Sequence, residues 1–177
     1  TMRHADLLAL VDSAQAGSLF PDSRDHGVDH WRGVTDQALW LADRFGWDSD
    51  HRRVAFVFGA VHDCRRLNDG FDPDHGERAA DWLVSTDWLT RLGLDHLEDR
   101  LVDALIRHDQ GDTCPADPLT SLGWDADRSL LARVGITPSP DFFSTVQGAD
   151  FAALISRGAQ VIRRPQDWTS LARRALA

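Results

Sequence analysis

Histidine and aspartate stand side by side at His62-Asp63, where the most continuously apolar stretch of the chain ends. Such a pair at the end of a buried helix costs free energy unless a charged or polar group meets it there. A divalent cation would meet it, because it accepts neutral imidazole nitrogen and carboxylate oxygen together. By itself the dipeptide is weak support, since an aspartate that caps a neighbouring helix is the ordinary interpretation.

Further candidate ligands lie near the ends of other predicted helices, and such ends can converge in an antiparallel bundle. These residues are His30, His75, His108 and Asp125. His26 is an alternative to His30, but we prefer His30 because the apolar helical stripe continues from it. His26 precedes a glycine in a predicted loop and would then line the mouth of the pocket. Asp127 is an alternative to Asp125, since residues two apart point to different sides of a helix.

The elements that position these residues are predicted to be helices almost throughout, because apolar residues recur at helical spacing. The predicted helices cover residues 7–16, 29–45, 49–64, 74–84, 95–108, 125–134, 151–162 and 168–176. The third is apolar on nearly every side and is therefore expected to be buried, and Gly59 within it would let another element approach closely. We expect one all-α domain over residues 1–177, with a core at about 27–135 and a short helical C-terminal flank at 136–177 packed on that core.

A histidine on one helix, His-Asp on the next and a late aspartate resembles the HD superfamily of metal-dependent phosphohydrolases. The matching segments are Asp29–Val34, Val61–Arg66 and Asp125–Arg128, and the resemblance covers about residues 27–135. It implies a helical bundle of the HD-domain type. It also implies that the metal ligands are His30, His62, Asp63 and Asp125. Some members bind a second metal through additional histidines, and His75 and His108 match these.

The resemblance further implies hydrolysis of a phosphate mono- or diester, nucleotides among the substrates. Mixed imidazole and carboxylate ligands suit manganese, iron, cobalt, nickel or zinc, with magnesium also allowed, at one or two ions per chain. The metal would lower the pKa of a bound water. Of the candidate catalytic residues, Asp63 would bind the metal, and His75, Asp127 or an unidentified side chain would take the proton from that water.

Arginines beside the predicted ligands are candidate phosphate contacts, because a guanidinium matches phosphate oxygens bidentately. These are Arg65, Arg66 and Arg107, with His26 as a further substrate-binding candidate. The alternative for each arginine is an ion pair with one of the many nearby aspartates.

Two other functions fit the same residues. One is a di-iron oxygenase of the HD type, in which His75 and His108 also bind iron. The other is a non-catalytic module that binds a nucleotide. A Ser-His-Asp hydrolase is excluded, because the chain has no Gly-x-Ser-x-Gly elbow and no predicted sheet to carry one.

The composition of this 177-residue chain excludes several classes of partner and of chemistry. The formal net charge is −9, so a nucleic acid polymer is not an expected partner. All 19 basic residues are arginine, which excludes Schiff-base and P-loop chemistry. The two cysteines form no CxxC pair, and no apolar run approaches the ~20 residues that span a bilayer. We expect a cytoplasmic protein with a small phosphorylated substrate and no membrane partner. The sequence allows a homo-oligomer.

Overall fold

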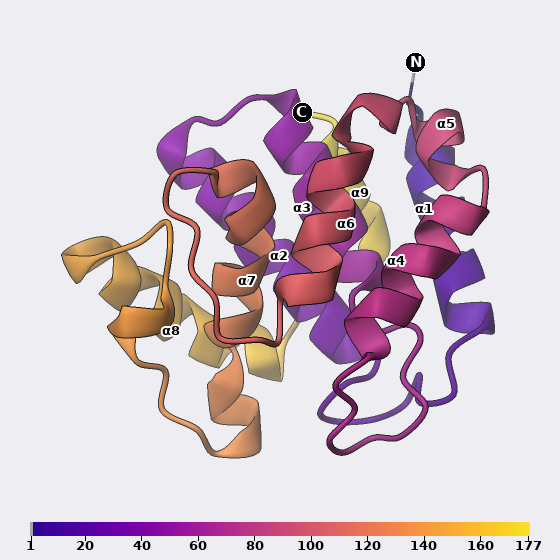
Figure 1. Cartoon of the computed structure of the whole chain (residues 1–177). Helices are drawn as coiled ribbons and strands as arrows, with labels where there is room; N and C mark the ends of the chain where they lie inside the picture. Colours follow the sequence, from indigo (N-terminus) through magenta and orange to yellow (C-terminus); the bar gives the residue numbers. More distant parts are fainter. Residues whose placement is uncertain (1) are drawn as a thin grey trace.

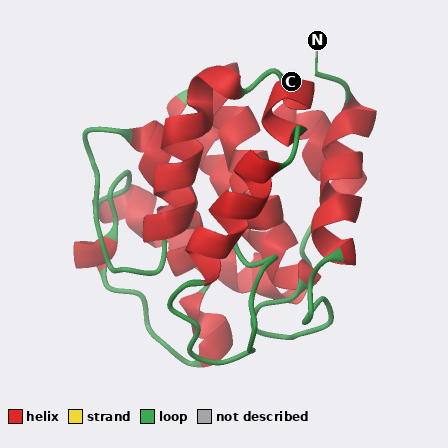
Figure 2. Cartoon of the chain, turned by 45° about the vertical axis from the view of Figure 1, so that its right-hand side comes forward, coloured by secondary structure: helices red, strands yellow, loops and turns green. Residues whose placement is uncertain are grey.

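The computed structural model describes residues 2–177, and every regular element within them is a helix (Figure 2). The α-helices are α1 (His4–Ala16), α2 (Val28–Phe45), α3 (Ser49–Val61), α4 (His75–Ser85), α5 (Trp88–Leu92), α6 (Glu98–Arg107), α7 (Pro118–Arg128), α8 (Gly148–Arg163) and α9 (Trp168–Ala175). Three short 3₁₀ helices, η1 (Asp95–Leu97), η2 (Leu131–Val134) and η3 (Pro140–Phe142), join them. The predicted all-α bundle is confirmed.

Helices α2 and α3 form the centre of the bundle, with α6 and α7 packed over them (Figure 1). Every residue of α3 from Val54 to Val61 is buried, as its unbroken apolar sequence predicts. At Gly59 a Cβ atom would lie 2.8 Å from the Cα of Thr35, so only glycine permits this close α2–α3 approach. The predicted role of Gly59 is therefore confirmed.

A second close approach joins α4 to α6. A Cβ atom on Gly76 would lie 2.2 Å from the carbonyl oxygen of Leu105 and 3.2 Å from the ring of His108. Because no side chain separates the two helices here, the residue that begins α4 and the residue that follows α6 come together.

The C-terminal flank packs on the core as predicted, with α8 against α2, and α9 against α1, α2 and α3. A buried carboxylate on α2, Asp36, receives hydrogen bonds from Arg157 of α8 at 2.7 Å and Arg174 of α9 at 2.5 Å. Both flank helices are thus tied to the central helix through one charge that burial alone would disfavour.

Two helix boundaries differ from the sequence prediction in ways that affect the site. Helix α3 ends at Val61, so His62 and Asp63 occupy the turns that follow it. Helix α7 begins at Pro118 rather than near Asp125, because proline is favoured in the first turn, where no N–H donor is needed. Within residues 2–177, no helix combines the length and the apolar character needed to cross a membrane.

Candidate metal centre

Six ionisable side chains from five helices meet inside the bundle, each from a helix end or the turn beside it. His30 lies in the first turn of α2, and His75 begins α4. His62 with Asp63 follows α3, His108 follows α6, and Asp127 lies in the last turn of α7. The predicted convergence of helix ends is present, and His30, His62, Asp63, His75 and His108 are all brought together.

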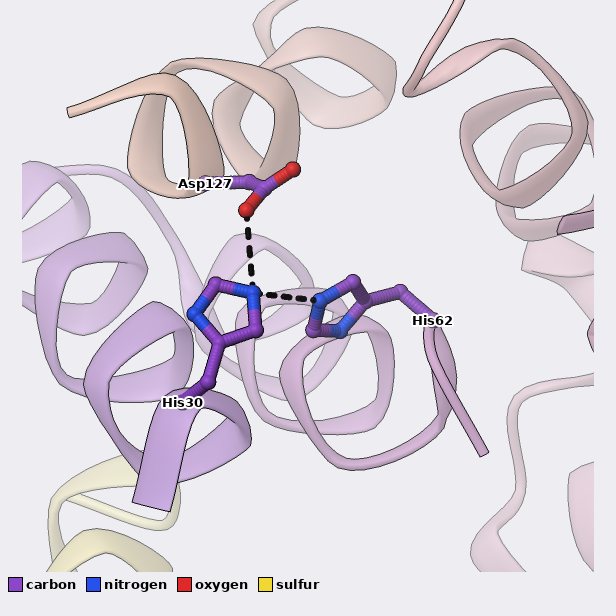
Figure 3. A group of neighbouring side chains, drawn as sticks. All are labelled: His30, His62 and Asp127. Carbon is purple, nitrogen blue, oxygen red and sulfur yellow. Dashed lines mark hydrogen bonds and ion pairs between the residues drawn. The ribbon is translucent and has the colours of Figure 1, made fainter. Parts of the chain in front are cut away.

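The first of two neighbouring clusters contains His30, His62 and Asp127, which are grouped closely enough to share an ion. Figure 3 shows the Nε2 atom of His30 between the two partners, 3.3 Å from Nε2 of His62 and 3.1 Å from Oδ1 of Asp127. Asp63 reaches the same cluster, because its Oδ2 atom lies 3.4 Å from His62 Nε2 and 3.6 Å from His30 Nε2.

The second cluster contains Asp63, His75 and His108. The two Nε2 atoms lie 2.9 Å apart, and Asp63 Oδ1 lies 3.2 Å from His75 Nε2. The Asp63 carboxylate therefore directs one oxygen toward each cluster.

These separations are those expected of atoms that share one cation. With metal–nitrogen and metal–oxygen distances of about 2.1 Å, neighbouring ligand atoms lie about 3.0 Å apart in octahedral geometry and about 3.4 Å apart in tetrahedral geometry. The closest of these separations run from 2.9 to 3.6 Å, and the ligand atoms of each cluster all lie within 4.8 Å of one another. The residues present fit a divalent ion in each cluster.

The backbone selects which ring nitrogen faces the clusters. The Nδ1 atoms of His62, His75 and His108 lie 3.1, 2.5 and 2.6 Å from carbonyl oxygens three residues earlier in the chain. A carbonyl oxygen only accepts, so each Nδ1 must carry a hydrogen, and in the neutral ring each Nε2 then presents a lone pair. In metal sites the ring nitrogen that does not bind the ion is held in the same way.

When both rings are neutral, two lone pairs therefore face each other across 2.9 Å between His75 and His108, and only a cation or a proton between them relieves their repulsion. A proton on His108 is disfavoured, because burial together with His62 and His75 lowers the pKa of His108 to about 3. A metal ion accepts both lone pairs.

The remaining charges also suit a cation. Burial lowers the pKa of His30 to about 4, and the positive charge of Arg133 acts in the same direction. Burial opposes ionisation of the two carboxylates, but His62 holds the pKa of Asp63 well below its usual range, and His30 does the same for Asp127. At neutral pH the clusters thus offer neutral His30 and His108 beside two carboxylates.

Three arginines were proposed from the sequence as phosphate contacts. In the structure of residues 2–177, only Arg66 of these three reaches the clusters. Its Nε atom donates to Asp63 Oδ1 at 2.8 Å, Nη1 donates to the Gly70 carbonyl, and Nη2 lies 3.5 Å from His75 Nε2. Arg66 is buried and orients the shared carboxylate.

The structure corrects the choice of Asp125 as a ligand. Both of its oxygens accept hydrogen bonds from the backbone N–H groups of Ser144 and Thr145 and from the Thr145 hydroxyl. Because α7 includes both aspartates, two residues of separation turn them about 200° apart on the helix. Asp127 faces the histidines, and Asp125 faces the loop after η3. The alternative named from the sequence, Asp127, therefore takes the position.

The predictions for Arg65 and Arg107 as substrate contacts are also corrected. The Arg65 guanidinium lies 4.1 Å over the Trp82 ring and donates to the Ala14 carbonyl. Arg107 pairs with two aspartates, Asp103 at 2.7 Å and Asp112 at 2.9 Å. Arg107 thus takes the ion-pairing role that was the alternative, whereas Arg65 packs on an aromatic ring, which was not predicted.

His26 lies beside the centre without joining it. Its ring centroid is 6.5 Å from that of His30, and its Nδ1 atom pairs with Asp69 at 3.0 Å. Ser23 also donates to Asp69, so the α1–α2 loop is tied to the α3–α4 loop next to the clusters.

Sequence reasoning missed Arg133, which lies in η2 with its Nη2 atom 3.7 Å from Asp127 Oδ1. It lines a cavity of about 640 Å³ that reaches His30. No motif surrounds Arg133, and its position near α2 arises only from the turn after α7. A smaller cavity of about 200 Å³ reaches the centre beside His108, Asp109 and Asp127.

No protein-family model, no curated protein and no solved structure matches this chain.

Proposed function

We propose that this chain is a metal-dependent phosphohydrolase that uses two divalent cations bridged by Asp63. The observation that carries the proposal is the division of the Asp63 carboxylate, with Oδ2 near His30 and His62 and Oδ1 near His75. A carboxylate between two cations about 3.5–4 Å apart is the arrangement that two-metal phosphatases use on an in-line displacement.

The first ion would be held by His30, His62, Asp63 and Asp127, and the second by Asp63, His75 and His108. When bound, such ions supply a water of lowered pKa and neutralise charge on the phosphoryl oxygens. The chain's own residues orient the site: Arg66 fixes Asp63, and three backbone carbonyls fix the ring tautomers of His62, His75 and His108. Asp63, His75 and Asp127 thus act as ligands in this proposal, and none of them is left to take the proton from the water.

The ligand chemistry favours a transition metal. Four imidazoles and two carboxylates suit manganese, iron, cobalt, nickel or zinc, whereas magnesium prefers a shell of oxygen atoms. The small substrate agrees with the net charge of −9, which disfavours a polyanionic polymer.

The test begins with protein stripped by a chelator and reloaded with manganese, cobalt, nickel, iron, zinc or magnesium in turn. Phosphate release is measured from p-nitrophenyl phosphate, its bis ester and a set of nucleoside monophosphates. We expect release that needs metal, is lost in Asp63→Asn and is kept in His96→Ala, since His96 pairs with Asp50 on the surface.

The same samples separate the rival functions. Two irons per chain with a visible absorption band and no phosphate release would favour the di-iron oxygenase. Nucleotide binding that raises the melting temperature without turnover under any metal would favour the non-catalytic module.

A further inference from the structure

The larger cavity extends away from the first cluster on the His30 side. Its walls come from four segments: the α1–α2 loop, the first turns of α2, η2 and the end of α8. At about 640 Å³ it lies within the usual range for a small-molecule site, about 300–1,000 Å³, and far exceeds the space that one phosphate needs.

One cation is fixed where this cavity meets the metal centre. The Arg133 side chain is only 10% exposed, and its Nε and Nη1 atoms donate to the carbonyls of Asp25 and Leu130 at 2.8 and 3.1 Å. Within residues 2–177, its Nη2 atom donates no hydrogen bond, and its ion-pair partner, Asp127 Oδ1, lies 3.7 Å away. The guanidinium is thus held in place with donors still free.

A second free donor lies at the same border. His30 is buried, and its Nδ1 atom has no hydrogen-bond partner among the described residues. Figure 3 shows that this nitrogen points away from His62 and Asp127, and the same residue lines the cavity. With Nε2 directed to the cluster, Nδ1 carries the ring hydrogen, and a buried N–H without an acceptor is costly. An oxygen atom of a bound molecule would satisfy it.

The rest of the cavity wall is about equally apolar and polar and close to electrically neutral. Pro21, Leu130, Ala132 and Ile162 supply the apolar wall. The charged lining residues other than Arg133 are Arg24, which is exposed, and two aspartates, Asp22 and Asp29. Two arginines against two carboxylates suit one phosphate group and disfavour a chain of several phosphates.

We infer that this cavity binds the organic part of a small phosphomonoester, an apolar or planar group of about nucleoside size, while Arg133 and His30 Nδ1–H hold the phosphate at its inner end. The inference rests on the proposed function for the reaction, but it concerns binding and is tested as binding. It makes Arg133 a substrate contact and Ile162 a specificity-determining residue.

The test uses phosphonates, whose P–C bond this reaction does not cleave, so that binding is measured without turnover. Isothermal titration calorimetry on manganese-treated protein compares phenylphosphonate, methylphosphonate and tripolyphosphate. We expect phenylphosphonate to bind about tenfold or more tightly than methylphosphonate, as burial of one aromatic ring predicts. Tripolyphosphate should bind no more tightly than phenylphosphonate.

Two variants with matched controls locate the contacts. Ile162→Asp should weaken phenylphosphonate about tenfold and leave methylphosphonate unchanged, whereas Val134→Asp, equally exposed at 36% but outside the cavity, should change neither. Arg133→Gln should weaken both phosphonates about tenfold with the manganese stoichiometry retained, whereas Arg163→Gln should not. Because Ile162 lies at the exposed rim, its variant tests the inference even if Arg133→Gln does not fold.

Equal affinity for the two phosphonates, together with an Ile162→Asp variant that binds like Val134→Asp, would overturn the inference. Failure of the proposed function looks different: phenylphosphonate binds in the expected pattern, but no phosphate ester is hydrolysed under any metal. A third outcome is hydrolysis of phosphate esters with KM values that neither variant changes. That result would support the proposed phosphohydrolase but exclude this cavity as its substrate site.

Discussion

The Nε2 atoms of His75 and His108 lie 2.9 Å apart, although the Nδ1 atom of each ring already donates to a backbone carbonyl. When both rings are neutral, they direct lone pairs at each other in a buried site, which is unfavourable without a shared cation or proton. The same repulsion becomes shared ligation when a cation enters. The fold is thus a scaffold whose converging helix ends a bound cation would stabilise.

Removal of metal is expected to destabilise the protein for this reason. A ligand that binds only the folded state adds about 2.7 kcal/mol to the free energy of unfolding at a hundred times its dissociation constant. Urea unfolding of chelator-treated protein should show that loss, and added manganese should restore it. Calcium, which prefers oxygen ligands, is the control and should restore little. Identical unfolding curves with and without transition metal would contradict this prediction.

Asp127 and Asp125 form a matched pair of carboxylates two residues apart on α7. Loss of an outer hydrogen bond to a metal ligand weakens metal binding by about 10–100-fold. Asp127→Asn removes a ligand itself and should therefore weaken manganese binding by more than this. Asp125→Asn should keep manganese but lower the free energy of unfolding by about 1–3 kcal/mol, because the N–H groups of Ser144 and Thr145 lose a charged acceptor. Titration calorimetry and urea unfolding measure the two effects. The reverse pattern would restore Asp125 as the ligand.

Gly76→Ala tests how the second cluster is assembled. The added Cβ would meet the Leu105 carbonyl at 2.2 Å, so α4 and α6 must separate. We expect a loss of about 1–3 kcal/mol in the free energy of unfolding, the usual cost of overpacking, together with weaker binding of one of two ions. Gly70→Ala is the control, since its nearest contact would be an ordinary 3.4 Å. A Gly76→Ala variant as stable as the control would contradict the close approach.

The pH dependence of the metal-free protein follows from the buried histidines. The unfolded chain protonates His30 and His108 near their ordinary pKa of about 6.5, but the folded chain does so only near about 4 and about 3. The unfolded state therefore binds more protons in this window, and the free energy of unfolding falls as the pH drops from about 6.5 toward 4. His62 acts in the opposite sense, because Asp63 raises its pKa against the effect of burial, but it is one group against two.

Urea unfolding at pH 7, 6 and 5 measures this slope, which should be on the order of 1 kcal/mol per pH unit for each proton taken up. His108→Gln should flatten it. Stability that rises between pH 6.5 and 5 would show that these imidazoles are not neutral in the folded protein.

Sequence reasoning located most of the centre, because helix-end placement is readable from periodicity. Five of the six clustered residues were predicted as ligands, and Gly59 was predicted as a close approach. The choice of Asp125 over Asp127 failed because the start of α7 was placed seven residues late, at Asp125 instead of Pro118. Which side of a helix faces inward depends on that boundary and on the loop that meets it.

The arginines show a different limit. Arg65 and Arg66 are adjacent in the chain, yet one packs on Trp82 and the other holds Asp63. The turn that follows α3 decides this, and turn geometry has no helical period to reveal it. Arg133 comes close to Asp127 through η2, which carries no motif. Tertiary contacts of this kind are visible only in the folded chain.

The number of metal ions per chain tests the shared carboxylate most directly. Native mass spectrometry of manganese-treated protein should find two ions in the wild type, one in His108→Ala and none in Asp63→Ala, with His96→Ala as the unchanged control. A wild type that binds no transition metal, or an Asp63→Ala variant that still holds two ions, would contradict the account.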